Sequence, residues 1–327
     1  MDLTQIFLLP LGEIFSATTA AYVLCALGLS MHFGFTGLLN FGQAAFAAVG
    51  AYAFAAAYNY LGFGLIGSLL FALVCVAIFA VLLGLPTLRL RADYLAIVTI
   101  AAAETFRYLM ISGEVGTWTG ATEGISGFGD QFYALNPIPK GVYNIIGLSL
   151  TDRELWADIA SWILVAVVAA LFTILTRSPW GRALKGIRED EDALRSLGKN
   201  VFAYKMQSMI IGGIAAGLGG ICYVLSTQTV QPTVYGTNFT FMTWTLLLLG
   251  GAATIAGPIV GGVVFFVLFL FLQNLLKGLS AIGWLPFLDD ALVAQIPFIL
   301  MGAALMLLVI FRPQGFFGNK KETQING

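Results

Sequence analysis

Apolar residues occur in long runs along this chain, and short polar segments separate the runs. A run of about 20 apolar residues is long enough to cross the hydrocarbon core of a bilayer as a helix. The nine runs of this kind cover residues 14–33, 41–60, 64–86, 93–112, 155–176, 204–227, 238–256, 258–276 and 290–311. We therefore predict an all-α polytopic membrane protein with about nine transmembrane helices, built as a single domain over residues 1–327. The start of the first span is the least defined, because Pro10 and Glu13 lie just before it in an otherwise apolar stretch.

Composition supports the same class. The chain is 59% hydrophobic and 10% charged, with a mean hydropathy of +0.89, whereas soluble domains contain roughly 25% charged residues. Its net charge is −1, and its cations cluster where membrane topology already explains them. We therefore expect the lipid bilayer as a partner and no nucleic acid.

The distribution of Lys and Arg predicts the orientation, because these residues accumulate in cytoplasmic loops. Twelve of the sixteen lie in alternate loops and the tail: Arg89, Arg91, seven between residues 177 and 205, Arg312, Lys320 and Lys321. The loops of the other side contain only Lys140, Arg153 and Lys277, among ten acidic residues. We therefore expect the N-terminus outside the cell and the C-terminus in the cytoplasm.

A short charged segment, residues 177–202, interrupts the apolar runs near the middle of the chain. Ser178 followed by Pro179 is typical of a helix start, because Ser caps the first free N–H groups and Pro lacks one. Trp180, Leu184 and Ile187 then recur at helical spacing, which predicts one apolar face.

The second half of this segment predicts another short helix. It is expected to start within the acidic run 189–192, because negative charge suits a helix N-terminus. Leu194 and Leu197 would form its apolar face, and Gly198 would end it. Two short amphipathic helices of this kind predict a docking site on the cytoplasmic side. The alternative is a helix pair that lies on the lipid headgroups.

Polar residues inside the spans are candidates for a translocation path. Asn40 and Gln43 lie in a glycine-rich break between the first two spans, which is either a turn or part of the path. Glu104 and Arg107 lie three residues apart in the fourth span, so they share a helix face and can form an ion pair. Charged residues in spans usually face protein or water. This pair either fixes the fourth span to its neighbours or borders the path.

Several sequence blocks carry a resemblance to a known family. Asp192-Ala193-Leu194, followed after three residues by Gly198, is similar to the E-A-A-x-x-x-G loop by which ABC importer permeases engage their ATPases. Asp and Leu here replace the usual Glu and second Ala. Residues 178–198, 88–107, 35–52 and 247–262 resemble the corresponding blocks of LivM-type branched-chain amino acid ABC transporter permeases. The similarity extends over most of residues 20–315.

This resemblance implies an importer in a bacterial cell membrane. Its further parts would be a second, homologous permease, two cytoplasmic ATP-binding subunits and an extracytoplasmic substrate-binding protein. The residues expected to engage the ATPase are Glu189, Asp190, Glu191, Asp192, Ala193, Leu194 and Gly198. The chain has no phosphate-binding loop, because its one Gly-Lys pair, at Gly198, is followed by Asn200 instead of Ser or Thr. We therefore expect no cofactor in this chain, with ATP bound by the partner subunits.

Other functions fit less well. An intramembrane metalloprotease needs two His residues and a Glu on one helix, but the chain has a single histidine, His32. A secondary transporter needs ionisable groups near the bilayer centre, for which only Glu104 and Arg107 qualify. The exact cargo stays open, since related permeases carry urea, short amides or other amino acids.

Overall fold

Each of the nine predicted apolar runs overlaps a helix. The computed structural model describes residues 3–145, 148–281, 290–311 and 315–317. The helices of the first half are α1 (Leu3–Gly12), the 3₁₀ turn η1 (Glu13–Phe15), α2 (Ala17–Leu29), the π-helical turn η2 (Ser30–Phe35), α3 (Gln43–Asn59), α4 (Leu65–Thr87), α5 (Ala92–Ile111), the 3₁₀ turn η3 (Gly113–Val115), α6 (Gly116–Thr119) and α7 (Asp130–Ala134). Those of the second half are α8 (Asp152–Arg177), α9 (Pro179–Glu189), α10 (Glu191–Ser196), α11 (Val201–Thr227), α12 (Thr237–Gly250), α13 (Ala256–Ala281) and α14 (Asp290–Phe311).

Six helices in the described part of the chain are long and apolar enough to cross a membrane. They are Ala17–Phe35, Leu65–Thr87, Asp93–Ile111, Asp152–Arg177, Val201–Thr227 and Ala256–Ser280. Helices α3 and α12 are shorter, with 17 and 14 residues. The chain is thus a multi-pass helical protein, and the count of nine spans stays a prediction.

The predicted seventh span ends too late. It was expected to reach residue 256, but α12 ends at Gly250. Gly251 follows with a φ of +113°, a backbone conformation that side chains disfavour and glycine tolerates. Residues 251–256 are therefore apolar in composition, but they contain a turn.

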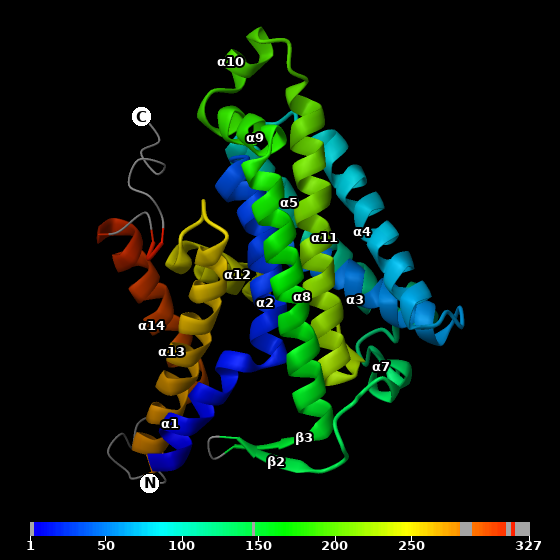
Figure 1. Cartoon of the computed structure of the whole chain (residues 1–327), viewed down its shortest axis with the longest axis vertical. Coiled ribbons are helices and arrows are strands. Elements are labelled where there is room, and N and C mark those ends of the chain that lie inside the picture. Colours follow the sequence, from blue (N-terminus) through cyan, green and yellow to red (C-terminus); the bar gives the residue numbers. More distant parts are fainter. Residues whose placement is uncertain (1–2, 146–147, 282–289, 312–314, 318–327) are drawn as a thin grey trace.

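Short strands occur outside the long helices. Strand β1 (Ile125–Ser126) pairs antiparallel with β4 (Thr229–Val230), and β2 (Val142–Ile145) pairs with β3 (Leu148–Thr151). The β2–β3 pair lies near α1, at one end of the molecule (Figure 1). The prediction of an all-α protein therefore holds for the spans but missed these strands.

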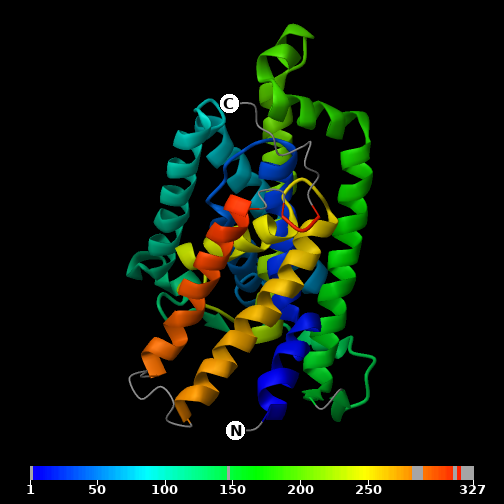
Figure 2. The same cartoon turned by 90° about the vertical axis from the view of Figure 1, so that its left-hand side faces the viewer.

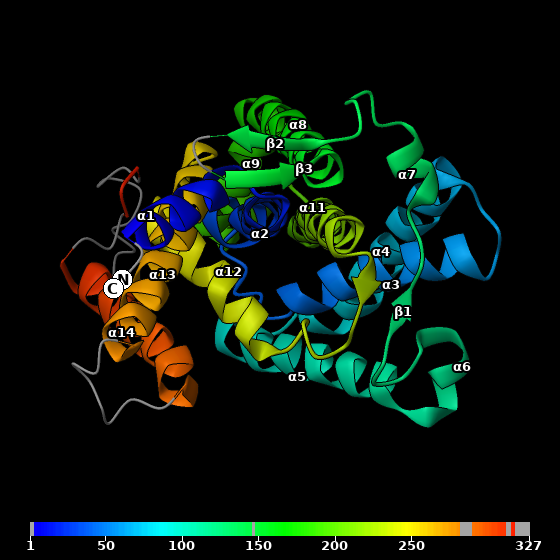
Figure 3. The ribbon, with the colours of Figure 1, turned by 90° about the horizontal axis from the view of Figure 1, so that it is seen from below.

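Helix α2 lies at the centre of the bundle, next to α11 (Figure 3). Its residues from Ala17 onward are almost all buried. Glycines allow α11 to approach its neighbours: a side chain at Gly220 would meet the backbone of Ala47 on α3, and one at Gly217 would meet Val76 on α4. Small residues at crossings are the usual means of tight packing between membrane helices.

The two ends of the molecule differ in character. Helix α9 lies across one end of the bundle and α10 protrudes beyond it, while α1 and the β2–β3 pair lie at the other end (Figures 1 and 2). Between these ends, the outward faces of α4 and α8 expose apolar side chains such as Ile66, Ile78, Ile163 and Ile174. These faces suit contact with lipid.

Candidate functional site

Helix α9 begins and packs as its sequence predicts. The Ser178 hydroxyl accepts a hydrogen bond from the Gly181 N–H at 3.4 Å, and Pro179 occupies the first turn. Leu184 and Ile187 are buried against the bundle. Trp180 lies partly buried on the same face and donates from Nε1 to Gln207 of α11 at 2.7 Å. Helix α9 is thereby held crosswise on the end of the bundle (Figure 2).

Helix α10 starts and ends at residues that sequence analysis identified. The Asp190 carboxylate caps it, accepting hydrogen bonds from the Asp192 and Ala193 N–H groups at 3.0 Å each. Gly198 follows the helix with a φ of +74°, the left-handed conformation that commonly terminates helices.

The acidic residues of this segment have different surroundings. Glu191 is engaged within the chain, with Arg195 Nη2 and Lys205 Nζ each 2.5 Å from its carboxylate oxygens. Asp192 lies 3.2 Å from Arg195 but its side chain is 89% exposed. Glu189 is also exposed, 3.9 Å from Arg188. Glu189 and Asp192 are therefore more accessible to a partner than Glu191 is, and the role of all three in docking stays a prediction.

The predicted apolar face of α10 is only half correct. Leu194 packs against a buried cluster that includes Leu184 and Ile187. Leu197, in contrast, is 75% exposed, because it follows the last turn and points away from the bundle end. We refer to residues 192–200, which are exposed except for Leu194, as the tip.

The break between α2 and α3 is a buried polar cluster. His32 Nε2 lies 3.1 Å from the Met209 carbonyl oxygen, so it carries the proton, and Nδ1 accepts from Asn40 Nδ2 at 3.0 Å. Asn40 Nδ2 also lies 3.3 Å from Gln43 Oε1, and Gln43 Nε2 donates to the Cys25 carbonyl at 2.7 Å. Asn40 and Gln43 are almost fully buried. Their polar atoms are thus satisfied within the chain.

Glu104 and Arg107 form the predicted ion pair. Arg107 Nε and Nη2 lie 2.8 and 2.7 Å from Glu104 Oε2. The other carboxylate oxygen accepts a hydrogen bond from the Thr237 hydroxyl at 2.6 Å, at the first turn of α12. The Arg107 guanidinium also lies 4.5 Å from the ring centre of Tyr108. The pair is partly open: the side chains of Glu104 and Arg107 are 28% and 19% exposed.

Sequence analysis did not identify Lys205, Thr237 or Arg188 as partners of the candidate residues. Lys205 lies 14 residues from Glu191, and Thr237 lies 133 residues from Glu104. No local pattern relates positions this far apart. Only the packing of α11 on α10, and of α12 on α5, places them together.

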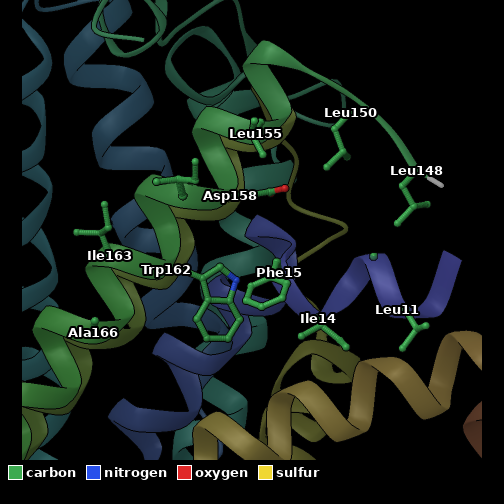
Figure 4. A pocket seen from close by; sticks show the side chains of 12 residues that line it. Leu11, Ile14, Phe15, Leu148, Leu150, Leu155, Asp158, Trp162, Ile163 and Ala166 are labelled. Carbon is green, nitrogen blue, oxygen red and sulfur yellow. The ribbon is translucent and has the colours of Figure 1, made fainter. Parts of the chain in front are cut away.

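A cavity of about 580 Å³ lies between η1, β3 and the start of α8 (Figure 4). Its lining is mostly apolar, including Phe15, Leu148 and Ile163. Its carboxylate, Asp158, accepts a hydrogen bond from the Ala17 N–H at 2.7 Å, at the N-terminus of α2. A negative charge there stabilises the helix start, so we assign this carboxylate a structural role.

Comparison with known families decides the class of protein. Residues 13–310 match the family model described as the permease component of a branched-chain amino acid transport system. The chain belongs to this permease family. It is therefore a transport subunit of the membrane and not a catalytic enzyme. Permease components of this kind work in a transporter complex with other subunits.

Individual relatives agree with this membership. The high-affinity branched-chain amino acid permease LivM of Escherichia coli is 30% identical over 94% of this chain and 71% of its own length. LivM of Salmonella typhimurium has the same identity and coverage. A probable LivM of Methanocaldococcus jannaschii is 23% identical over 91% of both chains. No solved structure is significantly similar to the chain.

Proposed function

We propose that this chain is the membrane-spanning permease subunit of a binding-protein-dependent ABC importer for branched-chain amino acids. The observation that carries the proposal is the family match over residues 13–310, together with LivM relatives that align along nearly the whole chain. Its partners would be a second, homologous permease, two ATP-binding subunits and an extracytoplasmic substrate-binding protein. Urea, short amides or other amino acids are the alternative cargo.

The ATP-binding subunits would dock on the α9–α10 segment. Helix α9 is anchored by its buried face, and α10 is tied to α11 through Glu191 and Lys205. The tip, in contrast, presents Asp192 and Leu197 to solvent. The segment is thus anchored at α9 and at Glu191, and it ends in an exposed tip with apolar and acidic side chains. Such a tip suits a protein partner, because exposed aliphatic groups next to charges are typical of interfaces.

The substrate would cross beside the Glu104–Arg107 pair. The exposed surface of α5 includes this partly open ion pair as well as apolar residues. In this it differs from the outward faces of α4 and α8, which expose apolar side chains. Charges at this depth usually face protein or water. A zwitterionic amino acid has charges of both signs, so a surface with both signs can accompany it. Asn40 and Gln43 remain candidates for the same path.

In the membrane, the α9–α10 end would face the cytoplasm of a bacterial cell. The cations of residues 177–205 support this orientation. Helix α1 and the β2–β3 pair would then lie outside, where the binding protein delivers the substrate.

The docking proposal is tested by changing the tip without disturbing the contacts that anchor α9 and Glu191. We expect Asp192→Lys combined with Leu197→Ala to abolish co-purification of the ATP-binding subunit, because both side chains are exposed. The ion pair of Asp192 with Arg195 lies within α10 and does not attach this helix to the bundle. Reversing Glu191 would be ambiguous, since it would break the bonds to Arg195 and Lys205. Uptake of labelled leucine in reconstituted vesicles gives the second measurement.

The matched control is Glu123→Lys, which reverses the charge of an exposed residue at the end of the molecule opposite α10. It should leave co-purification unchanged. Normal co-purification of the tip variant would overturn the docking proposal and favour helices that lie on lipid. Uptake of urea or an amide in place of leucine would correct the cargo.

A further inference from the structure

Helix α9 makes a direct polar contact with the break between α2 and α3. Arg188, in its last turn, donates from Nη1 to the Gly34 carbonyl oxygen at 2.5 Å. The Arg188 side chain is only 16% exposed. Hydrogen bonds from a charged donor are roughly twice as strong as neutral ones. The end of α9 is therefore tied to the backbone of η2, at the break between α2 and α3.

The break is shaped to receive this arginine. Gly34 lies in the last turn of η2, where helix carbonyl groups lack partners within the helix. Gly37 adopts a φ of +77°, and a side chain there would lie 3.1 Å from Arg188 Cγ. A larger residue at position 37 would be strained and would press on the arginine.

The same break leads into the membrane-spanning core. His32, in η2, bonds to Asn40, and the Asn40 carbonyl accepts a hydrogen bond from Trp244 of α12 at 3.2 Å. Helix α12 in turn begins at Thr237, which bonds to Glu104. A series of hydrogen bonds, continued by helix α12, thus connects the Arg188–Gly34 contact with the partly open Glu104–Arg107 pair. Segments of π-helix such as η2 are frequent at functional sites.

We propose that Arg188 is the positioning residue that transmits movement of the α9–α10 segment to the break between α2 and α3. The inference rests on the proposed function, because the movement would come from the docked ATP-binding subunits. When the segment shifts, the guanidinium moves the Gly34 carbonyl and with it η2. The hydrogen bonds of His32 and Asn40 then carry the change to α12. Loss of Arg188 would leave docking intact but separate ATP hydrolysis from transport.

Arg188→Gln tests this role in the complete complex, with partner permease, ATP-binding subunits and binding protein. The quantity measured is labelled leucine transported per ATP hydrolysed. We expect this ratio to fall by at least about fivefold, the lower end of coupling between distant sites, while ATP-binding subunits still co-purify. Arg91→Gln is the matched control, since it removes an equal charge from an exposed position at the start of α5, outside the α9–α10 segment. It should leave the ratio unchanged.

Arg188→Lys separates coupling from folding. Lysine keeps the charge and a donor but lacks the forked guanidinium, so it should restore part of the ratio. An unchanged ratio in Arg188→Gln overturns the proposal. A parallel loss of co-purification, hydrolysis and uptake also overturns it, because that pattern shows a structural or docking role. The tip variant at Asp192 and Leu197 tests docking separately, so failure of the proposed function is distinguishable.

Discussion

Removal of the Glu104–Arg107 pair gives the sharpest test of a translocation role. Three bonds define the pair: two from Arg107 to one carboxylate oxygen, and one from Thr237 to the other. Glu104→Gln alone leaves the guanidinium beside the ring of Tyr108 without its counter-charge. The double change to glutamine leaves no charge stranded, and position 104 keeps an oxygen that can accept from Thr237.

The stability effects follow from these contacts. Breaking a buried ion pair by removing one partner costs about 3–5 kcal/mol, whereas exposed pairs contribute about 0.2–1 kcal/mol. Because these side chains are 28% and 19% exposed, we expect a cost of about 1–2 kcal/mol for either single change. The double change should cost less than about 1 kcal/mol, comparable to one neutral hydrogen bond. Thermal unfolding of the purified chain in detergent measures all three variants.

Transport then separates the two roles. If the pair borders the path, the double variant should assemble and hydrolyse ATP on addition of loaded binding protein, with little leucine uptake. If the pair only fixes α5 to α12, uptake should be nearly normal. Thr105→Val is a control on the same helix, since its hydroxyl bonds only to the carbonyl of Ala101 in the contacts described. Normal uptake by the double variant would refute the path role, and additive losses from the single changes would refute the ion-pair argument.

Two further predictions concern packing and orientation. Gly220→Ala should destabilise the chain by about 1–3 kcal/mol, because the added carbon would lie 2.7 and 2.9 Å from two backbone carbons of Ala47; Gly302→Ala, with no neighbour within 4 Å, should not. Equal thermal unfolding of these variants would contradict the close approach of α11 and α3. Cysteines at Ser149 in β3 and Ser196 in α10, both exposed, should react with impermeant reagents from opposite sides, with position 149 outside. Labelling from the same side would disprove the orientation.

Local signals explain most of what the sequence predicts correctly. The apolar runs locate the helices, because a backbone in lipid must satisfy its hydrogen bonds internally. Ser178, Pro179 and Gly198 locate the ends of α9 and α10, because capping depends on neighbouring residues only. The ion pair of Glu104 and Arg107 was predictable for the same reason, since three residues bring two side chains to one helix face.

Contacts between distant elements were not predictable in this way. Leu197 has the spacing of a buried residue but lies beyond the helix end, where the bundle offers nothing to pack against. The bond between Arg188 and Gly34 joins residues 154 positions apart. The turn at Gly251 was missed because glycine and alanine both count as apolar in composition, whereas the backbone freedom of glycine decides the conformation at position 251.

The surroundings of the four candidate path residues differ, and the difference bears on where a substrate could bind. Asn40 and Gln43 are almost fully buried and hydrogen-bonded within the chain. A substrate at this position would have to replace those bonds, and an unsatisfied buried group costs about 1–3 kcal/mol. Glu104 and Arg107, in contrast, have exposed surface already. A substrate can approach them without disrupting the hydrogen bonds between α2 and α3, so we propose the surface of α5 beside α12 as the place for the path.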